Sequence, residues 1–277
     1  MINLRTLAGK KIPAIGLGAM PLDEYGKMPE KGALELLRYA VKAGIKLIDT
    51  ADVYGLGHNE ELIGKAFSSE QKKNIIIATK AGCTRPGGTG WGTDGRPEHI
   101  KKAVAGSLQR LGVKQIYLYQ LHAPDSRLSL METIKAFKEL QDADLIKHFG
   151  VSNFSLAQLQ QAEKIMEIVS VQNQFSLAYR YDEWELLPYL TKNNIAYLPY
   201  FPLGGKQRNI AADGRLQRLA QALGHSPTQV ALAWIVNKWP TAIPIPGTTN
   251  KKHLEENLKA GEIELSEKVM KELEKST

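Results

Sequence analysis

Three side chains that could move a proton lie near the ends of two apolar segments. Asp49 and Tyr54 belong to the segment Leu47–Tyr54, and Lys80 closes the strand-like segment Asn74–Lys80 further along the chain. A phenol titrates at about 10, but a nearby ammonium group favours the phenolate, so a tyrosine beside a lysine can act as an acid near neutral pH. Burial opposes this effect, so the lysine must stay charged, and Asp49 is its candidate counterion. The three residue types together indicate proton transfer.

Short aliphatic segments alternate along the chain with longer segments of helical periodicity. Apolar residues recur at helical spacing over residues 33–41, 100–111 and 156–166. Ser155 is the expected N-cap of the third helix, while Gly44 and Gly112 follow the first two, where a left-handed residue often ends a helix. The expected strands are Ile15–Gly18, Lys46–Asp49, Asn74–Thr79, Ile116–Leu121, Lys147–Val151, Val169–Gln172, Ile195–Pro199 and Ala242–Ile245.

Eight strands that alternate with helices predict parallel strands joined by right-handed crossovers. An open doubly wound sheet and a closed (β/α)₈ TIM barrel both fit this pattern, and the count of eight favours the barrel. The 277 residues show no linker and no break in composition, so we expect a single domain over residues 1–277. Leu4–Leu7 and Ile12–Ile15 flank Ala8–Lys11 and predict a hairpin that closes the bottom of the barrel. A final helix is expected after Ser266.

In such a barrel the chemistry lies at the carboxyl ends of the strands and in the loops that follow them. Asp49, Lys80, His122 and the pair Ser152-Asn153 come at the ends of expected strands two, three, four and five. Alone, Asp49 would more often cap a loop, and His122 would more often be a hydrogen-bonded core histidine. Four polar positions that meet at one mouth instead indicate an active site.

A series of short motifs, in order along nearly the whole chain, resembles the aldo-keto reductase superfamily. The motifs are Ile48–Gly55, His58–Gly64, Ala78–Lys80, Leu121–Asp125, Gly150–Phe154, Val171–Gln174, Leu198–Gly205, Ile245–Thr249 and Leu254–Asn257. The resemblance implies a reductase that passes hydride from NADPH to the carbonyl of small aldehydes or ketones. Tyr54 would then give the proton to the developing alkoxide, assisted by Lys80, Asp49 and His122. Such a positioned acid typically contributes ~10²–10⁴ in rate.

The same resemblance implies where the cofactor binds. Ser152, Asn153 and Gln172 would bind the nicotinamide carboxamide, Tyr200 would stack on the ring, and the backbone of residues 201–205 would lie under the pyrophosphate. The implied cofactor-binding residues are Gly18, Met20, Asp49, Ser152, Asn153, Gln172, Tyr200, Phe201, Pro202, Leu203, Gly204, Gly205, Ile245, Gly247, Thr248, Thr249, His253, Glu256 and Asn257.

Three positions depart from the superfamily pattern. Gly247 and His253 stand where the family often has a lysine or arginine against the 2′-phosphate, and Phe201 stands where a serine is common. Thr248 keeps a hydroxyl there. We therefore expect NADPH/NADP⁺ as the cofactor and leave NADH open.

Composition argues against several other functions. The net charge of +7 is spread along the chain without a basic block interleaved with aromatic residues, so we expect no nucleic-acid partner. No segment approaches the ~20 apolar residues of a membrane span, and the N-terminus lacks a secretory signal. The only cysteine, Cys83, is expected to be an inert thiol, and six scattered histidines give no metal-ligand spacing. We expect a cytoplasmic monomer.

The substrate stays open at this stage. The pocket walls are expected from Ala81–Pro97, Leu22–Pro29 and the end of the chain, with Trp91 either over the pocket or on the surface. Because the chain stops at Thr277, soon after the last helix, we predict an open and tolerant site. A narrower alternative is a pyridoxal reductase-like enzyme, suggested by the segment Gly82–Pro86. Another is a nucleotide-sensing regulatory module resembling channel β-subunits, which turnover of a simple aldehyde would separate from an enzyme.

Overall fold

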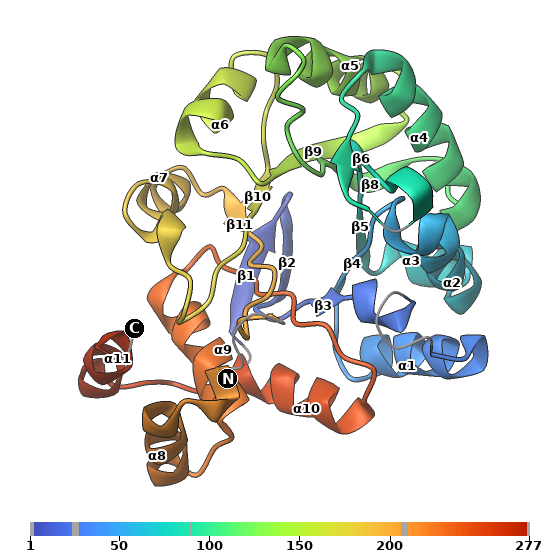
Figure 1. Ribbon diagram of the computed structural model, residues 1–277. Helices are drawn as coiled ribbons and strands as arrows, with labels where there is room; N and C mark the ends of the chain where they lie inside the picture. Colours follow the sequence, from blue (N-terminus) through green and yellow to red (C-terminus); the bar gives the residue numbers. More distant parts are fainter. Residues whose placement is uncertain (1–2, 24–27, 89, 206–209, 276–277) are drawn as a thin grey trace.

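The computed structural model describes residues 3–23, 28–88, 90–205 and 210–275. Seven parallel strands form one curled sheet in the order β11-β10-β9-β8-β5-β4-β3, and the helices surround it as an outer ring (Figure 1). The strands are β3 (Leu17–Gly18), β4 (Leu47–Asp49), β5 (Ile76–Ala81), β8 (Ile116–Leu121), β9 (Ile146–Ser152), β10 (Ser170–Gln172) and β11 (Ala196–Tyr197). The (β/α)₈ barrel expected from the sequence is therefore confirmed.

The segment Ala242–Ile245, predicted as the eighth strand, does not form a regular strand. It still fills the gap between β11 and β3, because Ile243 N donates to Tyr197 O (2.8 Å) and Gly16 N donates to Pro244 O (3.0 Å). The residues at positions 244 and 246 are prolines, which have no N–H and so cannot sustain a regular ladder. The barrel closes through isolated bridges instead.

A two-stranded hairpin closes the N-terminal end of the barrel, with β1 (Leu4–Leu7) paired antiparallel to β2 (Lys10–Pro13). Its turn is only Ala8-Gly9, both at positive φ (48° and 78°), which suits a two-residue hairpin. The second strand therefore begins at Lys10 and not at Ile12 as predicted. In Figure 1 the hairpin lies inside the ring of strands. Leu7 and Ile12 are buried there, in one cluster with inward-facing residues of β4, β5 and β8.

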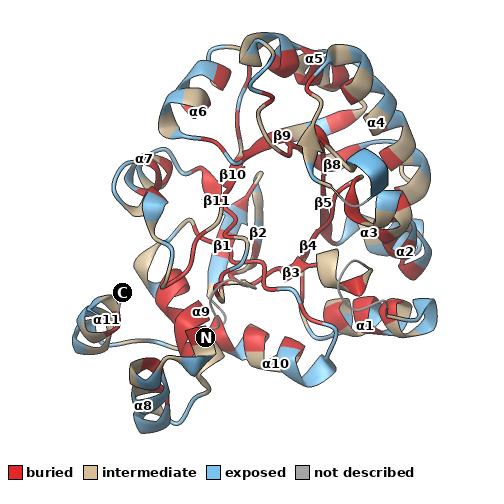
Figure 2. Cartoon of the chain, viewed as in Figure 1, coloured by how far each residue is buried: buried red, intermediate tan, exposed pale blue. Residues whose placement is uncertain are grey.

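The helices present their buried residues to the barrel (Figure 2). They are α1 (Glu30–Lys42), α2 (His58–Ala66), α3 (Ser69–Lys73), α4 (Pro97–Leu111), α5 (Leu130–Asp142), α6 (Leu156–Ala162), α7 (Leu186–Lys192), α8 (Gly214–Leu223), α9 (Pro227–Lys238), α10 (Lys251–Ala260) and α11 (Glu267–Glu274). The described ranges contain no helix that is both long and apolar enough to cross a membrane.

The predicted helix ends agree with the structure in most cases. Ser155 caps α6 through a capping box with Gln158, and Gly112 ends α4 in a left-handed conformation (φ 61°). Gly44, just beyond α1, also has a positive φ of 115°. The third helix is shorter than predicted, because α6 ends at Ala162 and leaves residue 166 in the following turn.

The loops after the strands contain small elements of their own. The glycine-rich loop Ala81–Pro97 folds back as an antiparallel pair, β6 (Cys83–Thr84) and β7 (Gly92–Thr93). After β4 the chain forms the short 3₁₀ segment η2 (Tyr54–Gly57). Of the loop Leu22–Pro29, which the sequence assigns to a pocket wall, positions 24–27 lie outside the described residues.

Candidate active site

A buried ion pair lies at the carboxyl ends of two neighbouring strands. Lys80 of β5 and Asp49 of β4 are joined by a contact of 2.7 Å between Lys80 Nζ and Asp49 Oδ1. Lys80 is fully buried and also donates to Thr50 O at 2.6 Å. The second carboxylate oxygen of Asp49 accepts from Gln172 Nε2 at 2.8 Å and from Gln120 Nε2 at 3.4 Å. These hydrogen bonds are what a buried ion pair requires to offset the loss of hydration.

Tyr54 and His122 lie next to this ion pair. Lys80 Nζ is 5.0 Å from the centre of the Tyr54 ring, and the rings of Tyr54 and His122 meet edge to face with centroids 5.7 Å apart. Burial, together with the positive charges of Lys80 and Arg85, lowers the pKa of His122 well below its usual value. The imidazole is therefore neutral near pH 7. The structure thus brings together all four side chains that the sequence predicts as catalytic.

A cavity of about 610 Å³ opens above these four residues and is lined by the loops after the strands. Asp49, Tyr54 and His122 lie on its wall, while Lys80 is buried behind Asp49. The predicted cofactor-binding residues that line the cavity are Gly18, Met20, Asp49, Ser152, Asn153, Gln172, Tyr200, Phe201, Pro202, Leu203, Gly205, Ile245 and Gly247.

The remaining predicted cofactor-binding residues lie outside the cavity wall. They are Gly204, Thr248, Thr249, His253, Glu256 and Asn257. His253 is exposed in the first turn of α10, where the backbone N–H groups of residues 252 and 253 donate to the N-cap Asn250. Thr248 is buried, and its Oγ1 accepts from Asn250 N at 3.1 Å. Thr248, Thr249, His253, Glu256 and Asn257 therefore belong to the end of the loop after Gly247 and to α10, while Gly204 belongs to the turn at residues 201–205.

One side of the cavity is a tight turn of backbone at residues 201–205. Phe201, Gly204 and Gly205 all have positive φ (48°, 90° and 66°), and Gly204 N donates to Phe201 O at 2.9 Å. Elsewhere on the wall, a Cβ atom at Gly18 would stand 2.7 Å from the carbonyl oxygen of Ile245. Glycine is therefore needed where this strand passes the loop that closes the barrel.

Asn153 is held in a left-handed conformation (φ 60°) at the end of β9. Its Nδ2 donates to His122 O at 2.8 Å, and its Oδ1 accepts from the Tyr200 hydroxyl at 2.8 Å. Its own N–H donates to Gln172 O at 3.0 Å. Asn153 therefore ties together the loops that carry the histidine, the tyrosine ring and the glutamine.

The cavity wall also contains residues outside the predicted catalytic and cofactor-binding sets, and two of them come from the loop Ala81–Pro97 that the sequence assigns to the pocket wall. Pro21, Cys83, Trp91 and Pro246 are the additional lining residues. The Trp91 and His122 rings meet edge to face with centroids 6.0 Å apart, and the Arg85 guanidinium lies over the Trp91 ring, 3.6 Å from its centroid. Burial raises the pKa of Cys83 to about 12, in keeping with an inert thiol. The position of Trp91 depends on the pairing of β6 with β7, which the glycine-rich sequence of this loop does not predict.

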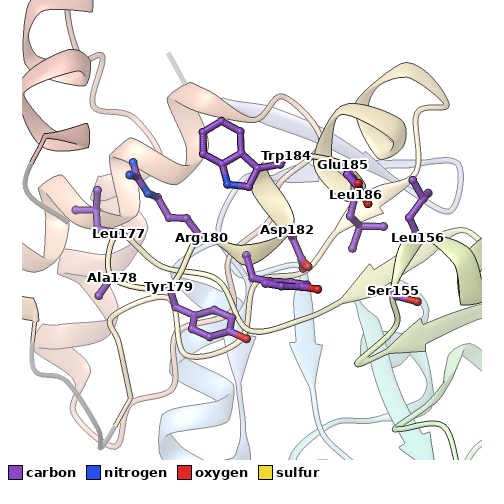
Figure 3. A pocket seen from close by; sticks show the side chains of 11 residues that line it. Ser155, Leu156, Leu177, Ala178, Tyr179, Arg180, Asp182, Trp184, Glu185 and Leu186 are labelled. Carbon is purple, nitrogen blue, oxygen red and sulfur yellow. The ribbon is translucent and has the colours of Figure 1, made fainter.

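A second cavity, of about 650 Å³, lies between the start of α6 and the 3₁₀ segment η4 (Tyr181–Glu183) (Figure 3). It is open and flanked by exposed aromatic rings, with Trp184 at 79% exposure. Two of its charged groups have partners, since Arg180 pairs with Glu183 at 3.4 Å and Asp182 accepts from Asn173 at 2.8 Å. No polar groups converge there as they do around Lys80. In the described part of the chain no cluster of three metal-binding side chains occurs either.

The Aldo/keto reductase family matches residues 14–277, and this chain belongs to that oxidoreductase family. Pyridoxine 4-dehydrogenase of Escherichia coli is 35% identical over 283 residues, which cover 98% of this chain and 97% of the relative. The thermostable aldo-keto reductase Tm1743, solved with the inhibitor epalrestat, has a TM-score of 0.86 and 33% identity, with 99% of each chain covered. An aldo/keto reductase of Klebsiella pneumoniae, solved with NADP and acetate, has a TM-score of 0.85 and 25% identity, covering 99% of this chain and 95% of that one. The family resemblance read from the motifs is confirmed.

Proposed function

We propose that this protein reduces the carbonyl group of small aldehydes or ketones with NADPH, and that Tyr54 is the proton donor. The observation that carries the proposal is the placement of a fully buried, charged Lys80–Asp49 pair directly behind Tyr54 and His122. Membership of the family and the NADP-bound Klebsiella pneumoniae structure support the choice of cofactor.

The residues around the cavity fit a nicotinamide dinucleotide. Gln172 uses its Nε2 on Asp49, which leaves its carbonyl oxygen for the carboxamide of a nicotinamide, and Ser152 and Asn153 lie on the same wall. The Tyr200 ring offers an aromatic face, and the backbone turn at residues 201–205 lets a pyrophosphate approach closely. When bound, NADPH supplies the hydride that the carbonyl carbon receives.

The protein's own contribution is to the carbonyl oxygen. Negative charge develops on that oxygen as hydride arrives, and a donor aimed at it lowers the barrier. The Tyr54 hydroxyl gives its proton to the oxygen, and the ammonium of Lys80 stabilises the phenolate that remains. Asp49 and the Thr50 carbonyl keep Lys80 charged although it is buried. His122, being neutral, can donate a hydrogen bond to the oxygen without adding a second buried cation.

Pyridoxal is the first specific substrate to test. Escherichia coli pyridoxine 4-dehydrogenase is 35% identical over nearly the whole of both chains. The cavity wall beside His122 is formed by the rings of Tyr54 and Trp91, and this wall fits a planar aromatic aldehyde. A panel that contains pyridoxal, benzaldehyde and small aliphatic carbonyls therefore tests both the reaction and its breadth.

The decisive variant is Tyr54→Phe, which keeps the ring and removes the hydroxyl. Reduction should fall ~10²–10⁴-fold in kcat, while NADPH affinity, followed by quenching of tryptophan fluorescence, should not change. Tyr181→Phe removes a hydroxyl from an exposed ring outside the site and is the matched control. Activity of Tyr54→Phe within tenfold of the parent would assign the proton to another group. Tight NADPH binding with no turnover of any compound in the panel would instead favour the nucleotide-sensing alternative.

A further inference from the structure

A second ion pair lies on the opposite face of β5 from Lys80. Side chains of a strand alternate between faces, so Thr79 points outward to the helices where Lys80 points inward. Thr79 Oγ1 donates to Glu60 Oε1 at 2.5 Å, and Glu60 Oε2 accepts from Arg110 Nε at 2.8 Å and from Arg110 Nη2 at 2.7 Å. Glu60 is fully buried in the first turn of α2, and Arg110 comes from the last turn of α4. The pair thus joins β5 to two helices.

Three glycines make room for Arg110. A Cβ atom at Gly57 would lie 2.7 Å from Arg110 Cδ, one at Gly64 would lie 2.1 Å from Arg110 O, and one at Gly106 would lie 2.7 Å from Arg110 Nη1. The first two glycines belong to the segment that follows Tyr54, and the third belongs to α4 itself. Arg110 therefore fills a slot against the backbone between Tyr54 and α2.

That stretch of backbone is strained. Gly55, Leu56 and Gly57 all have positive φ (54°, 54° and 100°), and Leu56 is a bulky side chain in a region that such residues rarely occupy. Strain of this kind persists only when surrounding contacts fix the backbone. Here the far end is fixed by Glu60 and by Asn59, whose side chain bonds to Thr50 Oγ1 at 2.7 Å and donates to Ala19 O at 2.9 Å.

We propose that Arg110 is a positioning residue for the reaction. By holding Glu60 and packing on Gly57, it keeps the turn at residues 54–57 in the conformation that places the Tyr54 ring beside Lys80. Arg110 touches neither the cavity nor the reacting atoms, so its effect must pass through Tyr54. The inference rests on the proposed function, in which Tyr54 is the acid.

A further carboxyl group in this region depends on the same cation. Asp52 lies two residues before Tyr54, and its Oδ1 is buried with no partner among the described residues. Burial and the charge of Glu60 raise the pKa of Asp52 to about 8, while Arg110 opposes that rise. Without Arg110, the charge of Glu60 would still raise the pKa of Asp52, and one of the two cations that oppose this rise, Arg110 and Lys80, would be missing.

The test compares Arg110→Met, Arg110→Lys and the double variant Arg110→Met/Glu60→Leu. The single Met variant should lose kcat 10–100-fold with NADPH affinity and KM within threefold of the parent. Lysine should recover part of the loss, because it restores the charge but not the two-pronged contact. The double variant removes both charges, so it should regain thermal stability yet keep the low kcat. Arg215→Met, which breaks the partly exposed pair with Glu272 on α11, is the control and should keep its activity.

The same changes made in Tyr54→Phe identify the route of the effect. In that background Arg110→Met should cause no further loss of the residual rate. If kcat recovers together with stability in the double variant, or if the losses from Arg110 and Tyr54 multiply, the positioning role is wrong and Arg110 is merely structural. If Arg110→Met does not fold, Thr79→Val, which removes one hydrogen bond to Glu60 at nearly constant volume, is measured by the same criteria. Full activity of Tyr54→Phe itself would overturn the proposed function, and that result is distinct from all of these.

Discussion

Replacing either partner of the Lys80–Asp49 pair should destabilise the protein strongly, whereas replacing both should cost less than the sum. Lys80→Met leaves the buried carboxylate with the hydrogen bonds from the Gln172 and Gln120 amides, at 2.8 and 3.4 Å. Asp49→Asn leaves a buried ammonium without a counterion in this group, with neutral acceptors such as the Thr50 carbonyl, at 2.6 Å. Losing one member of a buried pair costs about 3–5 kcal/mol. Because the carboxylate retains two donors, we expect Lys80→Met near the lower end and Asp49→Asn near the upper end.

The measurement is urea unfolding at pH 7 for the parent, the two single variants and Lys80→Met/Asp49→Asn. With a constant m-value, the midpoints give differences in the free energy of unfolding. The double variant contains no uncompensated charge, so the coupling energy should be at least about 2 kcal/mol. Lys65→Met breaks the exposed pair with Glu30 (3.1 Å) and is the control, with an expected change of about 0–1 kcal/mol.

Two results would refute this reasoning. Single variants that each lose less than the exposed control would mean that the pair is better hydrated than its burial implies. Strict additivity in the double variant would mean that Lys80 and Asp49 do not stabilise one another. In addition, Lys80→Met should lower kcat at least ~10²-fold, because no cation then stabilises the Tyr54 phenolate. Asp49→Asn should also lower kcat, because Lys80 then lacks the carboxylate that keeps it charged.

Two further predictions concern pH and cofactor choice. The folded-state pKa of His122 lies well below 6.5, so the unfolded chain binds the proton more tightly. The free energy of unfolding should therefore fall as pH drops below about 6.5, by at most about 1.4 kcal/mol per pH unit. Urea midpoints measured from pH 7 to 5 should change less steeply with pH in His122→Gln, and an unchanged pH dependence would exclude His122 as its cause. NADPH affinity should weaken between 50 and 300 mM salt while NADH affinity stays level, because Lys251 and Lys252, which follow the Gly247 loop at the start of α10, are exposed and open to screening. Equal salt dependence for both nucleotides would show that these lysines do not contact the 2′-phosphate.

The strand ends that carry the chemistry could be predicted because they follow long apolar segments. Ile116–Leu121, the strand before His122, matches β8 without error, and the strand that ends at Asp49 is correct to within a residue. The strand that carries Lys80, β5, begins and ends two residues later than predicted. The sequence also predicted the α6 cap and the hairpin, since both depend on local preferences. The shift of β2 and the irregular eighth strand were missed because they depend on a two-residue turn and on two prolines. Both features are determined by hydrogen bonding between segments, which local sequence preferences do not show.

The pocket wall could not be predicted for a different physical reason. The loop Ala81–Pro97 contains six glycines, each with a wide choice of backbone conformation, so local preference does not select a shape. Its fold is instead selected by pairing of β6 with β7 and by the contact of Arg85 with Trp91. Likewise Arg110 and Glu60 are 50 residues apart, and no pattern in the sequence around either residue predicts that they form a buried ion pair.

The two ion pairs together explain how β5 is held in register. Every residue of this strand is buried, and the run from Ile75 to Ala78 is apolar on both faces, so hydrophobic burial alone would tolerate a slip by one residue. A slip would move Lys80 to the helix side and Thr79 to the barrel interior, since successive side chains alternate between faces. Lys80 would then lose Asp49, leaving a buried ammonium and a buried carboxylate without their ion-pair partners, and Glu60 would lose its hydroxyl donor. The polar residues at the end of β5 therefore fix the register that its apolar residues leave open, and the same register sets Lys80 beside Tyr54.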